Sequence, residues 1–107
     1  MRVLLDECLP GRKLKPAFPD HEMWTVADMN WRGFKNGALL ARAETEFDAF
    51  MTVDRSLPYQ QHAPTYDIII IVLRVRSNRL EHLLPLVASA TQALKAGKAG
   101  EVIEVGV

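Results

Sequence analysis

The chain opens with Arg2-Val3-Leu4-Leu5-Asp6-Glu7, a short apolar run that ends abruptly in two carboxylates. A strand buried on both faces of a parallel sheet has this pattern, with polar residues where the chain leaves the sheet. A second run of the same kind, FMTVD, ends at Asp54. Ligands of open α/β sheets bind outside the carboxyl ends of the strands. We therefore expect two strands to bring Asp6, Glu7 and Asp54 to one rim of a sheet.

The rest of the chain alternates between patterns typical of strands and of helices. Further strands are expected over residues 22–26, 49–53, 67–73 and 101–105, the last at an edge of the sheet. Helices are expected near Pro10, from Asn36 onward, and from Ser77 or Asn78 to about residue 95, where Pro85 should kink or split the helix. The order β-α-β-α-β-β-α-β predicts one domain over residues 1–107, a three-layer α/β/α sandwich with a mostly parallel central sheet.

Length and composition bound the class of protein. A chain of 107 residues, 49% of them hydrophobic, allows one domain with one core. No apolar run is long enough to span a membrane, and the chain opens directly with a strand, so we expect neither an anchor nor a secretory signal. One cysteine and zero net charge fit a cytoplasmic protein that lacks disulfides and binds nucleic acid, if at all, through a local basic patch.

The two aspartates that end strands are the sharpest candidates for a functional site. Carboxylates gathered on a rim repel one another, and a hard cation such as Mg²⁺ relieves that repulsion. Such an ion would lower the pKa of a bound water and neutralise charge on a phosphate, as phosphodiester hydrolysis requires. The alternative is that Asp6 and Asp54 only favour turns. Glu7 could be a third ligand if the strand has already ended, or it could be a surface charge or a partner for Arg12.

Other polar residues could complete the site. Asn36 could bind a cation or a substrate through its amide, although a plain N-cap role is the better explanation of this residue on its own. Arg55, Arg74 and Arg76 follow strand ends, so they could bind a phosphate or pair with the rim carboxylates. Arg74 and Arg76 should share a face while their strand continues. The loop over residues 57–66 could cover the rim as a flap.

Four motifs resemble those of the small stand-alone PIN-like proteins of prokaryotes, which are related to VapC-type toxin ribonucleases. The family opens with L-D-E-N-L-P, which reads LDECLP at residues 5–10. One branch carries G-x-K-N-G-E-L-L and F-D-x-F-L-T-V-D-R-N-L, which read GFKNGALL at residues 33–40 and FDAFMTVDRSL at residues 47–57. The same branch carries L-R-x-x-S-N-R-L-x-x-L-L-P-L, which matches residues 73–86. The resemblance spans most of the chain.

The resemblance implies a PIN-like fold, a Mg²⁺ or Mn²⁺ site and RNA as substrate. Asp6 and Asp54 match acidic positions of the family, whereas Asn36 stands where many relatives have aspartate and Ala38 where the close branch has glutamate. Cys8 and Ser56 replace the usual asparagines. Typical PIN nucleases use three or four acids, so two acids and Glu7 imply a single, weakly held ion. Family members are often toxins encoded beside a small antitoxin-like partner.

Three functions therefore stand as hypotheses. The first is a metal-dependent ribonuclease of PIN-like type, the toxin of a toxin–antitoxin pair. The second is the same fold with a decayed site, retained to bind a partner protein or to form a homodimer. The third is a receiver-like domain that accepts a phosphoryl group on Asp54. The absence of a lysine from the final strand argues against this third hypothesis.

Overall fold

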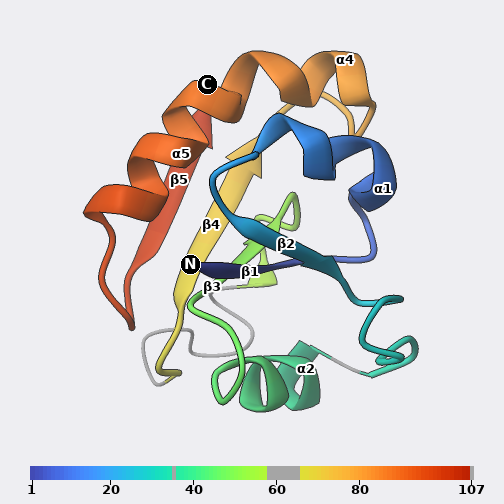
Figure 1. Cartoon of the computed structure of the whole chain (residues 1–107), viewed down its shortest axis with the longest axis vertical. Coiled ribbons are helices and arrows are strands. Elements are labelled where there is room, and N and C mark those ends of the chain that lie inside the picture. Colours follow the sequence, from blue (N-terminus) through green and yellow to red (C-terminus); the bar gives the residue numbers. More distant parts are fainter. Residues whose placement is uncertain (35, 58–65, 107) are drawn as a thin grey trace.

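The computed structural model describes residues 1–34, 36–57 and 66–106 of the chain. Figure 1 shows short strands and short helices along the chain. The described residues also form two 3₁₀ helices, named η1 and η3. The elements in chain order are β1 (Arg2–Leu5), α1 (Gly11–Leu14), η1 (Lys15–Ala17), β2 (Glu22–Thr25), α2 (Asn36–Ala43), β3 (Ala49–Thr52), β4 (Ile69–Arg74), α4 (Leu80–Leu83), η3 (Leu84–Leu86), α5 (Val87–Ala96) and β5 (Val102–Gly106).

The strands form one five-stranded sheet in the order β2-β1-β3-β4-β5. Every described strand pair is parallel, with Leu5 opposite Met51 between β1 and β3. The chain leaves β1 toward β2 on one side and then returns to place β3 on the other. The strand order therefore reverses between β1 and β3, where open α/β sheets form their ligand crevice.

Alternate strand residues enter two separate cores, one on each face of the sheet. Leu5, Met51 and Ile71 pack beneath the helices α1 and α5, whereas Leu4, Phe50 and Ile70 pack against α2. Figure 1 shows α1, α4 and α5 above the sheet and α2 below it. A parallel sheet needs both faces covered because its strands are apolar on both sides. The predicted three-layer α/β sandwich is confirmed.

The last predicted helix is divided at Pro85, as expected. Pro85 lies at the start of η3, between α4 and α5. The predicted cap is wrong, because Arg79 occupies the N-cap position and no side chain caps α4. The Ser77 hydroxyl instead accepts the N–H of Arg79 at 3.2 Å. The Asn78 amide donates to the carbonyl of Cys8 at 2.7 Å, so it joins two loops rather than starting a helix.

The isoleucine-rich strand is displaced by one or two residues from its predicted span. β4 begins at Ile69 and includes Arg74. Asp67 lies outside the ladder, and its N–H donates to the Glu44 carboxylate at 3.4 Å. Because β4 ends at Arg74, strand alternation does not extend to Arg76, and the condition under which both arginines would share a strand face is not met.

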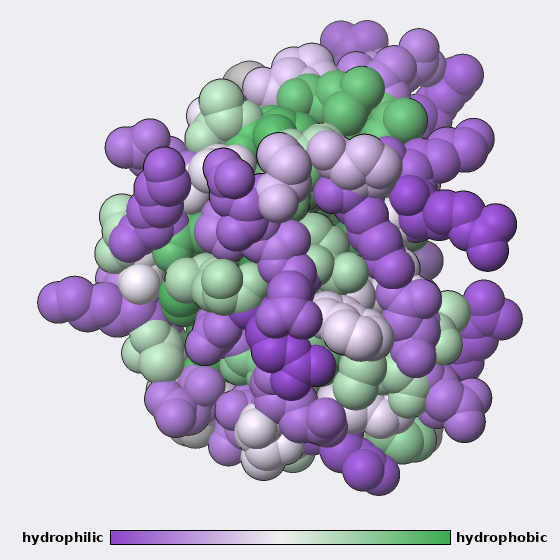
Figure 2. Space-filling model, viewed as in Figure 1, coloured by the Kyte–Doolittle hydropathy of each residue, from purple (hydrophilic) through white to green (hydrophobic). Residues whose placement is uncertain are grey.

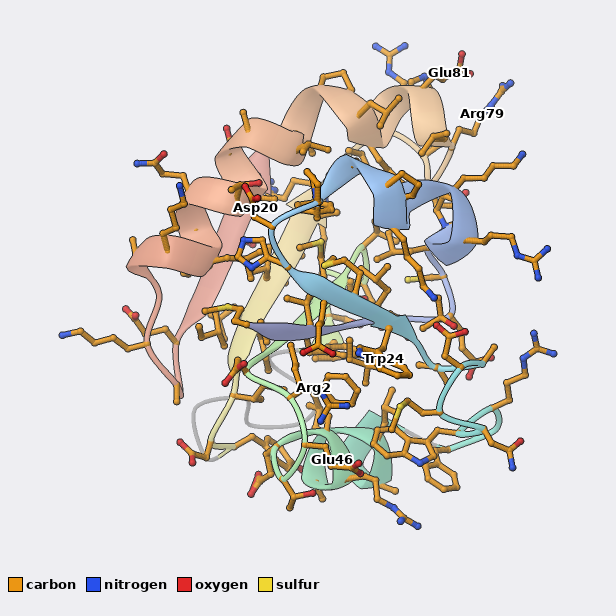
Figure 3. All side chains as sticks on the ribbon, in the orientation of Figure 1. Arg2, Asp20, Trp24, Glu46, Arg79 and Glu81 are labelled. Atoms are coloured by element: carbon orange, nitrogen blue, oxygen red, sulfur yellow. The ribbon has the colours of Figure 1, made fainter. Side chains whose placement is uncertain are left out.

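The face of the molecule seen in Figure 2 is mainly hydrophilic. Figure 2 shows an apolar patch at the top of one face, where α4 and η3 lie; Leu84 of η3 is 45% exposed. At the opposite side, the Arg2 guanidinium lies 5.5 Å from the Trp24 ring and donates to the carbonyl of Glu46 at 2.9 Å (Figure 3).

None of the described helices is long and apolar enough to cross a membrane.

The core beneath α2 should depend strongly on Phe50, whose side chain is fully buried. We expect Phe50→Ala to lower the free energy of unfolding by about 3–5 kcal/mol, because it removes a large apolar group and leaves a cavity. The control is Phe34→Ala, since Phe34 is 36% exposed and stacks on Trp31; it should cost about 1 kcal/mol. Urea unfolding of both variants measures the difference, and equal losses would contradict this account of the core.

Candidate functional site at the carboxyl ends of the strands

The rim of the sheet brings Asp6 and Asp54 to neighbouring positions. β1 and β3 are adjacent, and the N–H of Asp6 continues their ladder by donating to the carbonyl of Met51 at 3.0 Å. Asp54 follows β3 by two residues. Both aspartates are partly exposed. The prediction that these two acids share a rim is consistent with this placement.

Thr52 connects the two aspartates through its side chain. Its hydroxyl donates to Oδ2 of Asp6 at 2.7 Å and accepts the N–H of Asp54 at 3.0 Å. Thr52 is fully buried, unlike the acids that it joins. Sequence reasoning gave Thr52 no role. The available signal was a hydroxyl residue at the end of an otherwise apolar strand, since a buried hydroxyl needs a partner.

Each aspartate also stabilises the turn that follows it. Oδ1 of Asp6 accepts the N–H of Glu7 at 2.8 Å. Oδ1 of Asp54 accepts the N–H of Ser56 at 3.0 Å and its hydroxyl at 2.7 Å. Within the described residues, Oδ2 of Asp54 accepts no hydrogen bond. Both aspartates therefore stabilise turns, and Oδ2 of Asp54 is left at the rim for another ligand.

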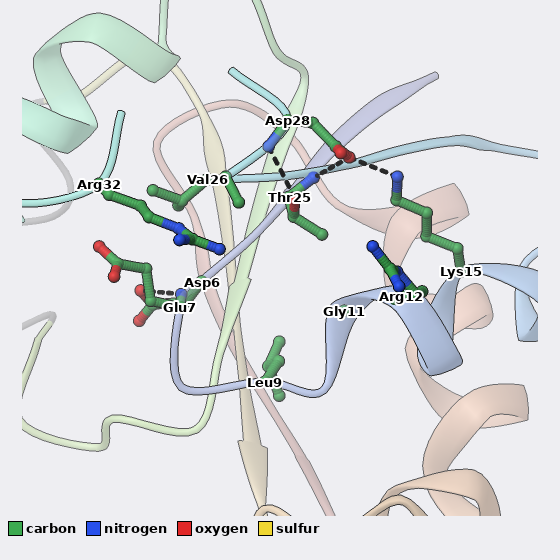
Figure 4. A pocket seen from close by; sticks show the side chains of 11 residues that line it. Asp6, Glu7, Leu9, Gly11, Arg12, Lys15, Thr25, Val26, Asp28 and Arg32 are labelled. Atoms are coloured by element: carbon green, nitrogen blue, oxygen red, sulfur yellow. Dashed lines mark hydrogen bonds and ion pairs between the residues drawn. The ribbon is translucent and has the colours of Figure 1, made fainter. Parts of the chain in front are cut away.

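A cavity of about 550 Å³ lies beside Asp6, between α1 and the end of β2 (Figure 4). Charges of both signs line it, and Lys15 forms an ion pair with Asp28 across one side. The hydrogen bond from Lys15, with that from the N–H of Thr25, holds the pKa of Asp28 below its usual value. We call this cavity the mixed-charge pocket; its charged lining residues are Asp6, Glu7, Arg12, Lys15, Asp28 and Arg32.

Glu7 and Arg12 both line the mixed-charge pocket, but they form no ion pair, so Glu7 is not the partner of Arg12. Lys15 and Arg32 had no predicted role. One local signal was Gly11, where a Cβ atom would lie 2.3 Å from Cγ2 of Thr25. Glycine there lets α1 approach β2 closely, and this approach places the start of α1 beside the pocket.

The three candidate arginines gather in a different cavity, of about 510 Å³. Arg55 follows β3, Arg74 ends β4, and Arg76 lies in the loop before α4. None forms an ion pair with Asp6, Glu7 or Asp54; among the described residues Arg74 pairs with Glu104, with 3.6 Å between Nη1 and Oε2. We call this cavity the arginine pocket.

The remaining candidates are not placed in either pocket. Asp54 lines neither of these pockets. Asn36 is the first residue of α2, and its side chain lies outside the described part, as does most of the expected flap at residues 57–66.

The thiol of Cys8 lies against the two linked residues. Its Sγ is 3.4 Å from Oδ2 of Asp6 and 3.6 Å from the Thr52 hydroxyl. Burial raises the pKa of the Cys8 thiol, and the negative charge of Asp6 raises it further. The thiol therefore stays protonated and behaves as a weak donor to Asp6.

The comparisons with known proteins leave the family unassigned. No family model, no curated protein and no solved structure matches the chain. Across residues 1–34, 36–57 and 66–106, no three side chains of histidine, cysteine, aspartate or glutamate group as a metal site would require. The PIN-like relationship and the metal thus stay predictions.

Replacing Thr52 should remove the hydrogen-bonded link between Asp6 and Asp54. Thr52→Val keeps the shape of the side chain but removes the donor to Asp6 and the acceptor for the N–H of Asp54. We expect a loss of about 1–3 kcal/mol in the free energy of unfolding and faster hydrogen exchange at the amide of Asp54. Thr52→Ser keeps the hydroxyl and should preserve that protection. Equal exchange at Asp54 in the two variants would contradict the proposed link.

Alkylation of Cys8 should report its raised pKa. At pH 8 we expect iodoacetamide to modify Cys8 more slowly in the folded protein than in urea. Asp6→Asn should speed the reaction of the folded protein without reaching the rate in urea, because burial is the larger cause. The pKa of the folded state lies above the ordinary value of 9.0, so the unfolded chain loses its proton first and the free energy of unfolding should fall above about pH 9. An unchanged rate in Asp6→Asn, with Asp20→Asn as the matched control, would exclude the effect of Asp6.

Proposed function

We propose that this protein is a metal-dependent ribonuclease of PIN-like type, with Asp6 and Asp54 as its acidic residues. The supporting observation is their position after adjacent parallel strands, where the strand order reverses. Ligand sites of open α/β sheets occur at that point. The motif resemblance supplies the reaction class, cleavage of an RNA phosphodiester bond.

The residues present fit one weakly held ion. Mg²⁺ is usually bound by one or two carboxylates and keeps several of its waters. Asp6 and Asp54 could supply these carboxylates, and Glu7 lines the same pocket as Asp6. When bound, Mg²⁺ or Mn²⁺ would lower the pKa of a coordinated water and neutralise charge on the phosphate.

The chain itself would orient the acidic groups. The Thr52 hydroxyl and the N–H of Glu7 hold the two oxygens of Asp6, so its carboxylate needs little reordering on binding. The two donors of Ser56 hold Oδ1 of Asp54 in the same way. Such preorganisation favours binding because fewer side-chain motions are lost. Arg55, Arg74 and Arg76 would contact the RNA backbone.

The biological setting follows from the resemblance alone. The motif resemblance implies a cytoplasmic toxin with a small antitoxin-like partner encoded nearby. Zero net charge implies that RNA binding depends on a local cluster of cations instead of the overall charge.

One observation favours a non-catalytic module with the same fold. Both aspartates already stabilise the turns that follow them, a role that needs no metal. In this alternative the rim is retained for stability, and the protein binds a partner or forms a homodimer.

The strand order 2-1-3-4-5 is shared by receiver domains, which is the observation in favour of phosphoryl transfer to Asp54. A shared fold alone does not specify chemistry. Incubation with a small phosphodonor, followed by intact mass measurement, tests this third hypothesis directly.

Thermal unfolding with Mn²⁺ or Mg²⁺ tests the main proposal. An ion at about 10 mM with a dissociation constant of ~1 mM adds about 1.4 kcal/mol to the folded state. The midpoint of wild type should rise by about 5 °C or more. The rise should disappear in Asp6→Asn and Asp54→Asn but remain in Asp20→Asn, which removes an exposed carboxylate before β2.

Cleavage of single-stranded RNA should follow the same pattern across these variants. Activity should require the ion, be lost in both rim variants, and persist in Asp20→Asn. No midpoint shift, together with a rim variant more stable than wild type, would mean that the acids repel each other without binding a cation. That outcome would reject the nuclease and favour the binding module.

A further inference from the structure

The arginine pocket concentrates positive charge at the carboxyl ends of β3 and β4. Three guanidinium groups line it, from Arg55, Arg74 and Arg76, together with the imidazole of His82. Its other lining residues include the apolar side chains of Pro85 and Leu86 and one carboxylate, that of Glu81. The pocket is therefore a concave site with a basic lining, separate from the mixed-charge pocket beside Asp6.

The acidic residues near this pocket do not balance its charge. Glu81 lines the pocket, but its carboxylate pairs with Nε of Arg79 at 3.0 Å, and both side chains are largely exposed (Figure 3). Glu104 is 3.6 Å from Arg74 and about half exposed, so the contact is longer than a hydrogen bond. The lining therefore keeps an excess of positive charge.

Arg74 also carries a side-chain donor that no described residue accepts. Its Nε is buried, and no acceptor among the described residues reaches it. Buried donors are normally satisfied, and a planar guanidinium suits two parallel bonds to an oxyanion. An anion in this pocket could accept from this arginine, which the nearby protein groups leave incompletely satisfied.

His82 is oriented by Ser77. The Ser77 hydroxyl lies 2.6 Å from Nδ1 of His82 and accepts the N–H of Arg79. A hydroxyl that accepts one bond has its own proton to donate. Donation to Nδ1 leaves the proton of a neutral imidazole on Nε2, so His82 keeps a donor for a further ligand.

We propose that the arginine pocket binds a terminal phosphate, the dianionic monoester group at the end of a nucleotide chain. Several cations around one concavity match the two charges of a monoester better than the single charge of an internal phosphodiester. Binding of a phosphate group stands on the pocket alone, whereas its attachment to a nucleotide chain rests on the proposed function. The pocket would then set which end of an RNA the rim acids receive.

Binding measurements without divalent ions test this proposal. Titration calorimetry in EDTA compares inorganic phosphate, adenosine 5′-monophosphate against adenosine, and a short oligoribonucleotide with and without a 5′-phosphate. We expect the terminal phosphate to improve affinity by about tenfold or more, which corresponds to about 1.4 kcal/mol. The preference should persist in Asp6→Asn, so failure of the nuclease proposal would not remove it.

Two exposed arginines supply the variants. Arg55→Gln and Arg76→Gln should each reduce the preference for the phosphorylated ligand, and the double variant should abolish it. Lys95→Gln is the matched control, since it removes an exposed charge from the end of α5. Tighter binding of the phosphorylated oligonucleotide than of the monophosphate would support a chain end as the ligand, and equal binding would reassign the pocket to mononucleotides. No phosphate preference, or one that survives the double variant, would overturn the proposal.

Discussion

The pairing of β1 with β3 determines where the candidate functional residues lie. Because the strands are parallel and adjacent, their carboxyl ends open on the same rim, where Asp6 follows β1 directly and Asp54 follows β3 by two residues. The pairing is specified by burial on both faces, since Leu4 and Phe50 enter one core while Leu5 and Met51 enter the other. A shift of one residue in either strand would exchange these faces and carry the rim residues with it.

The buried hydroxyl of Thr52 makes the two acids one unit. This hydroxyl donates its one proton to Asp6 and accepts the backbone N–H of Asp54. The acids therefore serve stability and orientation at once. This double use explains why a structural and a chemical interpretation of the same residues do not exclude each other, and why replacing either aspartate needs a readout other than folding alone.

The fold was largely predictable because apolar runs and breakers dominate short chains. The five strands, the division at Pro85 and the three layers all follow from pattern and spacing. The cap of α4 was not predictable, because the side chain of Asn78 donates to the carbonyl of Cys8, which lies 70 residues away in the chain. At the site, the rim position of Asp6 and Asp54 could be anticipated from strand ends. The separation of Arg55, Arg74 and Arg76 into their own pocket depends on how α4 and η3 lie over the rim, which no local pattern encodes.

The bond from Asn78 to Cys8 has a consequence for the order in which the rim forms. It joins residues 70 positions apart, and the bond from Thr52 to Asp6 joins residues 46 apart. Contacts between distant positions form late, because the entropy of closing long loops must be lost before they stabilise anything. The rim is therefore completed only when folding is nearly complete. A nascent chain that ends at β4 contains Asp6, Asp54 and Thr52, but it lacks Asn78, which bonds to the loop at Cys8.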